Sequence, residues 1–287
     1  MSHDNTKLAI IFALFAALFY SIMGVLVKIA EQTFPNEVVV FFRQLISAAL
    51  FFPFFLIGKK PKAKFKTNHF SLHLLRAFSS ISATYCLFYA IEYLPLVDAL
   101  LLSYTRPLFL PLVAYFWLDK RWNKNVWIGL CTGFLGVILI LKPSEKVFNL
   151  ASLIGLAAGL FGAVAFTAIR RLTKVESSDK ILLFYLLLSL PITVLPLVTT
   201  WTPFTLNQFG LLCLVGIVGM LYQMMLTRAY QYAKTYKVGS VLYSTVVFAA
   251  IFDWMMTGQY LDYVSIVGIA LIFVGSFATL KGQSKVN

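Results

Sequence analysis

Residues 90–136 of this 287-residue chain read AIEYLPLVDALLLSYTRPLFLPLVAYFWLDKRWNKNVWIGLCTGFLG, and residues 229–275 read AYQYAKTYKVGSVLYSTVVFAAIFDWMMTGQYLDYVSIVGIALIFVG. The stretches align without a gap at an offset of 139 (229 against 90) and share seven identities, among them Tyr104 with Tyr243. An odd number of expected membrane crossings separates the copies, so each would be inverted relative to the other. The pattern predicts two five-helix repeats, residues 1–143 and 144–287.

The composition is that of a membrane protein. Hydrophobic residues make up 60% of the chain, charged residues 12%, and the mean hydropathy is +0.84, which a water-soluble surface does not tolerate. Apolar runs of about 20 residues, the helix length that crosses a bilayer of about 30 Å, cover residues 8–28, 36–57, 71–92, 96–118, 125–142, 150–170, 180–200, 207–228, 238–257 and 262–281. We therefore predict an all-α integral membrane protein with ten transmembrane helices in two inverted five-helix repeats.

The basic residues predict the orientation in the membrane. When alternate loops are assigned to one side, 18 of the 24 Lys and Arg residues fall there, whereas the opposite loops hold Lys28, Lys142 and Lys146. By the positive-inside rule, both termini are expected in the cytoplasm, with the chain in a bacterial-type inner membrane. The basic loop GKKPKAKFK, residues 58–66, is then a topology signal, and no nucleic-acid partner is expected.

Four stretches carry a resemblance to a known family: FFRQLISAALFFPFFLIGK (residues 41–59), LLRAFSSISATYCLFYAIEYLPLVDALLLSYTRPLF (74–109), GLCTGFLGVILILKP (129–143) and GIALIFVGSFATL (268–280). They resemble the EamA family of the drug/metabolite transporter superfamily over essentially the whole chain. The resemblance implies a ten-helix carrier. It leaves the substrate open, because that superfamily is associated with amino acids, nucleotide sugars, drugs and S-adenosylmethionine.

Arg106 is the charged residue placed deepest in the membrane. It lies ten residues beyond Leu96, or about 15 Å deep, where a charge costs at least about 2.5 kcal/mol and needs a partner. Pro107 and Pro111 remove backbone donors, which predicts a broken or kinked helix of the kind that lines a cavity. Residues 103–107 are therefore the leading substrate-contacting segment, with the guanidinium binding a carboxylate or phosphate. In the alternative, Arg106 only pairs with a protein acid or with the freed carbonyls.

The other candidates for substrate binding are aromatic or hydroxyl side chains in the apolar runs. The set is Ser103, Tyr104, Tyr85, Tyr89, Tyr222, Tyr243, Ser244 and Trp254. Asp253 is the best-placed acid, and it either exchanges a coupling proton or forms a structural salt bridge with Arg106.

Several other polar residues have simpler interpretations. Arg43 and Arg76 lie within about 10 Å of an expected surface, so their side chains are expected to snorkel. His69 and His73 share a helical face, but two ligands are fewer than a metal site needs, and we expect both in solvent. No motif for a cofactor, a phosphate-binding loop or a protease occurs, so no cofactor is expected.

These observations together predict a secondary active transporter that moves a small anionic or zwitterionic metabolite, such as an amino acid or S-adenosylmethionine, by alternating access. Its expected partners are the substrate, the lipid bilayer and a candidate coupling proton, and the chain is expected to be a monomer or weak homodimer. Two alternatives stay open: a multidrug or organic-cation exporter of the same fold, and a membrane-embedded enzyme acting on lipid-linked substrates. The short loops count against the enzyme.

Overall fold

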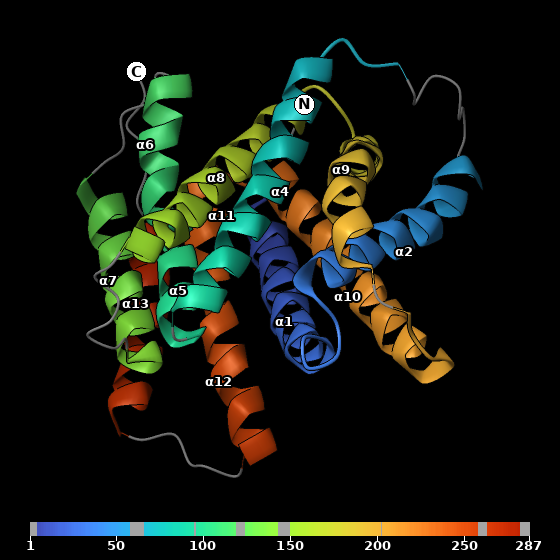
Figure 1. The fold of residues 1–287 in the computed structure, drawn as a ribbon. Helices are drawn as coiled ribbons and strands as arrows, with labels where there is room; N and C mark the ends of the chain where they lie inside the picture. Colours follow the sequence, from blue (N-terminus) through green and yellow to red (C-terminus); the bar gives the residue numbers. More distant parts are fainter. Residues whose placement is uncertain are drawn as a thin grey trace.

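A computed structural model describes residues 5–57, 66–94, 96–118, 124–142, 150–201, 203–257 and 263–281, and these form a bundle of helices without a strand (Figure 1). The helices before residue 143 are α1 (Thr6–Ala30), α2 (Asn36–Ile57), α4 (Phe70–Tyr93), α5 (Leu96–Ser103), α6 (Arg106–Leu118) and α7 (Lys124–Leu141). Those after it are α8 (Leu150–Leu172), α9 (Ser178–Thr200), α10 (Leu206–Tyr232), α11 (Thr235–Leu242), α12 (Ser244–Thr257) and α13 (Tyr263–Lys281). The expected boundary at residues 143 and 144 lies outside the described residues.

Within the described ranges, nine stretches are long and apolar enough to cross a membrane, so the chain is a multi-pass membrane protein. Two of these stretches each run through a pair of short helices, α5 with α6 and α11 with α12. The 24-residue α4 is also long enough to cross at about 1.5 Å per residue, but it is not among the nine. It carries His73 and Arg76 in its first two turns. Ten crossings therefore stay a prediction, with α4 as the tenth.

The predicted break at Arg106 is present between α5 and α6. α5 ends at Ser103, α6 begins at Arg106, and the backbone N–H of Thr105 donates to the carbonyl of Leu102 at 3.2 Å. This is a tight turn of the 3₁₀ type rather than a continued α-helix. Pro107 explains the position, because it has no N–H to donate to the carbonyl of Ser103.

A second break, which the sequence did not predict, separates α11 from α12 at Tyr243. The N–H of Tyr243 donates to the carbonyl of Ser240 at 3.3 Å, again closing a tight turn. No proline lies in α11 or α12, so the break is not dictated by a missing donor. α11 begins and ends 139 residues after α5 (235 against 96, and 242 against 103).

Close helix packing holds α7 and α13 together, and Figure 1 shows this pair on the opposite side of the bundle from α2, α9 and α10. Glycines occupy the crossing. A Cβ added at Gly275 would lie 2.5 Å from the carbonyl oxygen of Gly129, and one at Gly268 would lie 2.8 Å from that of Gly136. Side chains this small let two backbones approach closely. The other extensive packings are α1 with α10 and α4 with α8, so the two parts of the chain interleave.

Candidate functional site

A small cavity lies between the two helix breaks. In the described part of the chain its lining consists of Tyr20, Ser103, Tyr104, Arg106, Pro107, Phe166, Tyr222, Leu242, Tyr243 and Thr245. α1, α8 and α10 each contribute one aromatic residue, and the two broken helices supply the rest. Half of the lining residues are aromatic and one is charged, so the cavity offers flat apolar surfaces around a single positive group.

Arg106 supplies that positive group. Its Nη2 donates to the hydroxyl of Ser103 and, at 3.4 Å, to that of Tyr20. Its Cζ lies 5.9 Å from the ring centroid of Tyr20 and 6.0 Å from that of Phe166. Nε is buried without a hydrogen-bond partner, and no carboxylate among the described side chains pairs with the guanidinium. The described protein groups therefore leave both a donor and a positive charge available to an anionic ligand.

α8 makes room for Arg106 with a glycine. A Cβ added at Gly162 would lie 2.5 Å from Cδ of Arg106 and 2.9 Å from its Nε. One turn earlier, a Cβ at Gly159 would meet the hydroxyl of Thr105 in the first break. These two glycines let α8 pack directly against the break, and they fix how far the guanidinium projects into the cavity.

Tyrosines form the other walls. The rings of Tyr20 and Tyr222 lie with centroids 4.8 Å apart and planes tilted by 48°. Tyr243 is 0% exposed, and its ring rests on α7, where a Cβ at Gly133 would lie 2.9 Å from Cδ2. The hydroxyl of Tyr243 has no hydrogen-bond partner among the described residues. Buried tyrosine hydroxyls usually have a partner, so this one is available to a ligand.

Five of the residues proposed from the sequence line the cavity: Ser103, Tyr104, Arg106, Tyr222 and Tyr243. Ser244 lies directly after the second break, where its hydroxyl donates to the carbonyl of Val241 at 2.7 Å. That bond satisfies one of the last carbonyls of α11, which gives Ser244 a local role in the turn.

Tyr85, Tyr89 and Trp254 do not line the cavity. Tyr89 is 42% exposed and stacks on Tyr93 with ring centroids 4.6 Å apart, and Trp254 is also 42% exposed. They were selected by residue type, without knowledge of which helix face points inward. The side chain of Asp253 lies outside the described part of the structure, so its role stays a prediction.

Tyr20 and Phe166 were not predicted as site residues. They come from α1 and α8, and the positions 139 residues away hold Gly159 and Val27, so the repeat pattern gives no signal for either. Thr245 lies within the segment aligned with Arg106, and its carbonyl accepts a hydrogen bond from Ser21 at 2.8 Å.

Two polar residues of α4 are buried, which corrects the expectations for both. Arg76 is 0% exposed, so it does not snorkel; its Nη1 donates to the carbonyl of Ile181 at 2.5 Å and its Cζ lies 4.7 Å from the ring centroid of Tyr185. His73 is also 0% exposed rather than in solvent, with Nε2 2.5 Å from a carboxylate oxygen of Glu176. α9 and the connection that precedes it cover this end of α4, which a depth count along one helix does not reveal.

Comparison with known proteins identifies the family. The model of the EamA-like transporter family matches residues 7–142 and, separately, residues 149–281. The chain belongs to the EamA-like transporter family. The family resemblance of the sequence is thereby confirmed.

Named relatives of this EamA-family protein are transporters. It is 31% identical to the pseudopaline exporter of Pseudomonas aeruginosa, over 97% of this chain and 99% of that protein. The riboflavin transporter of Vibrio cholerae is 24% identical (95% and 94% covered), and the S-adenosylmethionine uptake transporter of Rickettsia bellii is 23% identical (86% and 84% covered). A crystal structure with 16% identity superimposes with a TM-score of 0.78 over 94% of this chain and 95% of its own, which shows the shared fold. The protein is therefore a membrane transporter rather than an enzyme.

Proposed function

We propose that this EamA-family protein is a secondary active transporter that binds a small anionic or zwitterionic metabolite at Arg106. The observation that carries the proposal is the state of the guanidinium: it borders the cavity, its Nε is buried without a partner, and no described carboxylate pairs with it. A positive charge deep in a membrane is costly without a counter-ion. A carboxylate or phosphate of the substrate supplies one, and the planar guanidinium can bind either in a bidentate manner.

The proposed architecture has ten crossings in two inverted five-helix repeats, with α4 as the tenth crossing. Three observations support it. The family model matches the chain twice, α11 has the bounds of α5 shifted by 139 residues, and α1 packs on α10 as α8, its equivalent in the second half, packs on α4. The basic residues favour cytoplasmic termini, and the named relatives come from bacteria, so we place the chain in a bacterial inner membrane.

The mechanism we infer is alternating access around the cavity. Each half contributes one broken helix, and a site between two inverted halves opens to either side when one half rocks against the other. Broken helices suit this position because backbone groups freed from the helix are tolerated where they line a cavity. Asp253 stays the candidate for proton coupling, and the oligomeric state is proposed as monomer or weak homodimer.

The substrate class follows from the chemistry of the lining. S-adenosylmethionine, the compound named for one relative, carries a carboxylate that matches Arg106 and a flat adenine that matches the tyrosine walls. Relatives are named both as an exporter and as an uptake transporter, so the direction of transport is left open. A ligand whose only charge is positive would be repelled by the same guanidinium.

Thermal unfolding of the detergent-purified protein with a panel of ligands tests the proposal. The panel contains amino acids, S-adenosylmethionine, nucleotides, organic anions and lipophilic cations. A true ligand at about 100 times its dissociation constant adds about 2.7 kcal/mol of stability. We expect a carboxylate or phosphate compound to stabilise the wild type.

Three variants locate the binding site. Arg106→Gln should abolish the stabilisation, and Arg106→Lys should weaken it, because an ammonium keeps the charge without the planar fork. Arg228→Gln is the matched control, since Arg228 is partly exposed and lies 3.9 Å from Asp179 outside the cavity. Stabilisation by lipophilic cations that persists in Arg106→Gln would replace the proposal with the cation exporter.

A further inference from the structure

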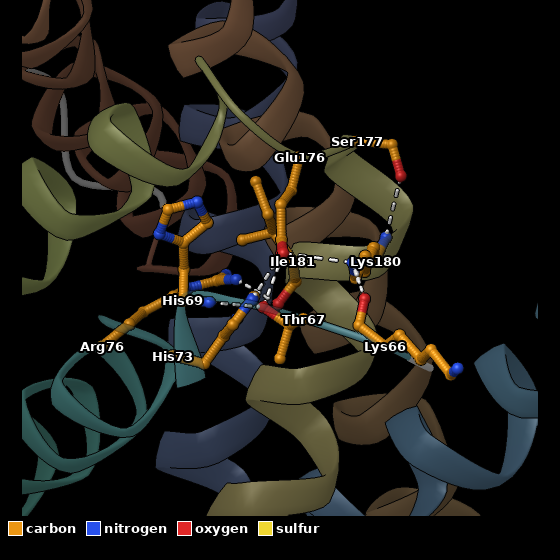
Figure 2. Close-up of polar contacts among 9 residues, drawn as sticks. All are labelled: Lys66, Thr67, His69, His73, Arg76, Glu176, Ser177, Lys180 and Ile181. Carbon is orange, nitrogen blue, oxygen red and sulfur yellow. Dashed lines mark hydrogen bonds and ion pairs between the residues drawn. The ribbon is translucent and has the colours of Figure 1, made fainter. Parts of the chain in front are cut away.

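A second polar cluster lies outside the cavity, where the start of α4 meets the connection between α8 and α9 (Figure 2). Glu176 is its centre. One carboxylate oxygen accepts from the hydroxyl of Thr67 at 2.6 Å and lies 3.1 Å from Nζ of Lys180, and the other lies 2.5 Å from Nε2 of His73. The side chain of Glu176 is 5% exposed and that of His73 is 0% exposed. These bonds join the first half of the chain to the second.

Glu176 is the anion of this cluster. Burial alone would raise the pKa of Glu176, but hydrogen bonds from Thr67, His73 and Lys180 outweigh it and hold the pKa below its ordinary value. The carboxylate is therefore charged at neutral pH and can only accept, so Nε2 of His73 carries the shared hydrogen. This fixes the tautomer of the imidazole in the closed cluster.

The second nitrogen of His73, Nδ1, has nowhere to place another proton. It is buried without a hydrogen-bond partner among the described residues. The charged groups that face the ring are Glu176, Lys180 of α9 and Arg76 of α4, two cations against one anion, and Phe184 of α9 stacks on it with centroids 4.4 Å apart. A protonated ring would bury an unsatisfied N–H beside two positive charges. The closed cluster therefore holds His73 neutral.

The equivalent positions at the other end of the bundle are apolar. At the offset of 139 residues, Glu176 corresponds to Glu37, but His73 corresponds to Leu212. Leu212 is 0% exposed and belongs to an apolar cluster that includes Phe34. The same scaffold thus carries an ionisable link between the halves at one end and hydrophobic packing at the other.

We propose that Thr67, His73, Glu176 and Lys180 form a pH-sensitive latch that keeps the two halves together at this end, which is cytoplasmic in the proposed topology. The proposal rests on alternating access, because bonds between the halves at one end favour the conformation closed at that end. Opening exposes the imidazole to water, where it binds a proton near a pH of about 6.5. The open form then binds the extra proton and the closed form does not, so falling pH through this range favours opening.

Cysteine labelling measures this opening directly, in purified protein whose three native cysteines are replaced by serine. Ser178 is 8% exposed beside the latch, and its hydroxyl donates to Gln231 at 2.7 Å, so Ser178→Cys reports on opening. Val175, 56% exposed in the same connection, gives the reference variant Val175→Cys. The ratio of their maleimide reaction rates cancels the pH dependence of the thiol chemistry.

We expect this ratio to rise about fivefold between pH 7.5 and pH 5.5. Glu176→Gln should raise the ratio at both pH values. His73→Phe keeps a ring against Phe184 but cannot titrate, so it should remove the pH dependence, and this variant alone decides if Glu176→Gln does not fold. Glu37→Gln, the equivalent change at the other end, should leave the ratio as in the wild type.

Three results would overturn the latch: a ratio in Glu176→Gln that stays as low as in the wild type, a pH dependence that persists in His73→Phe, or an equal effect of Glu37→Gln. The labelling needs no substrate. Its failure is therefore separable from failure of the proposed function, which the loss or persistence of ligand stabilisation in Arg106→Gln decides.

Discussion

Tyr104 and Tyr243 each follow the last residue of an eight-residue helix, and both line the central cavity. Their positions differ by 139, the same offset that relates α5 to α11. Their surroundings differ, because Arg106 follows Tyr104 in its turn whereas a serine and a threonine follow Tyr243. The cavity therefore has one charged wall and one uncharged wall, and we expect a substrate to bind with its anion toward α6 and its body toward α12.

The hydroxyl of Tyr243 is expected to bind the substrate. Tyr243→Phe removes one hydrogen bond, worth about 0.5 to 1.5 kcal/mol, and should weaken ligand binding by about three- to tenfold. The unfolding temperature without ligand should not fall, because the hydroxyl has no partner among the described residues. Isothermal titration with the ligand found in the panel checks the affinity.

Tyr230→Phe is the matched control for that change. Tyr230 is also 0% exposed with an unpartnered hydroxyl among the described residues, but it does not line the cavity. Its substitution should leave the affinity unchanged. Equal affinity losses in both variants would assign the effect to the packing of α10 and α12 rather than to a contact with the ligand.

Gly162 is expected to set the position of Arg106. In Gly162→Ala the new methyl would lie 2.5 Å from Cδ of Arg106, so the side chain must move away from its present position. We expect at least about a tenfold loss of affinity for the anionic ligand, or about 1.4 kcal/mol. Gly210→Ala is the control, because a Cβ there meets nothing within 4 Å. Unchanged affinity in Gly162→Ala would mean that Arg106 has a second position equally able to bind the anion.

The features predicted correctly from the sequence are local. A run of apolar residues predicts a membrane helix regardless of its neighbours, and Pro107 predicts the break before it because the missing donor belongs to one residue. The break at Tyr243 depends on tertiary packing instead. Its ring occupies the space that Gly133 of α7 leaves free, and no residue within α11 or α12 signals this.

The site was predictable where it coincided with such a local feature. Arg106 and its neighbours were found because a charge and two prolines stand out in an apolar run. Tyr20 and Phe166 are ordinary aromatic residues of their helices, and only the packing of α1 and α8 against the breaks turns them toward Arg106. The burial of His73 escaped prediction for the same reason, since its cover comes from a distant segment.

Two glutamates are expected to respond to pH with opposite signs. Burial raises the pKa of Glu31, which directly follows α1 and has a buried carboxylate oxygen without a partner in the described part of the chain. Its contribution to stability is therefore full below the ordinary carboxyl pKa of about 4.3 and is lost as the pH rises through the raised value. Glu176 has a lowered pKa, so its contribution is present above about 4.3 and is lost as the pH falls through the lowered value.

Substitution by glutamine should reveal both signs in thermal unfolding at pH 7.5 and pH 4. Glu31→Gln should raise the unfolding temperature at pH 7.5 and have little effect at pH 4. Glu176→Gln should lower it at pH 7.5, with a smaller loss at pH 4. Two variants that shift in the same direction at pH 7.5 would contradict the assignment of these charge states.

The crossing of α7 and α13 is expected to tolerate no added methyl. In Gly275→Ala the Cβ would lie 2.5 Å from the carbonyl oxygen of Gly129 and 2.8 Å from Cα of Gly133. Both are backbone atoms, so no change of rotamer relieves the contact and the helices must separate. We expect a loss of about 1 to 3 kcal/mol in the free energy of unfolding. Gly24→Ala, whose Cβ meets nothing within 4 Å, should leave stability unchanged or slightly higher. If Gly275→Ala cost no more than Gly24→Ala, the two helices would have to slide past each other freely, and the α7–α13 pair could not serve as the fixed axis around which the halves rock.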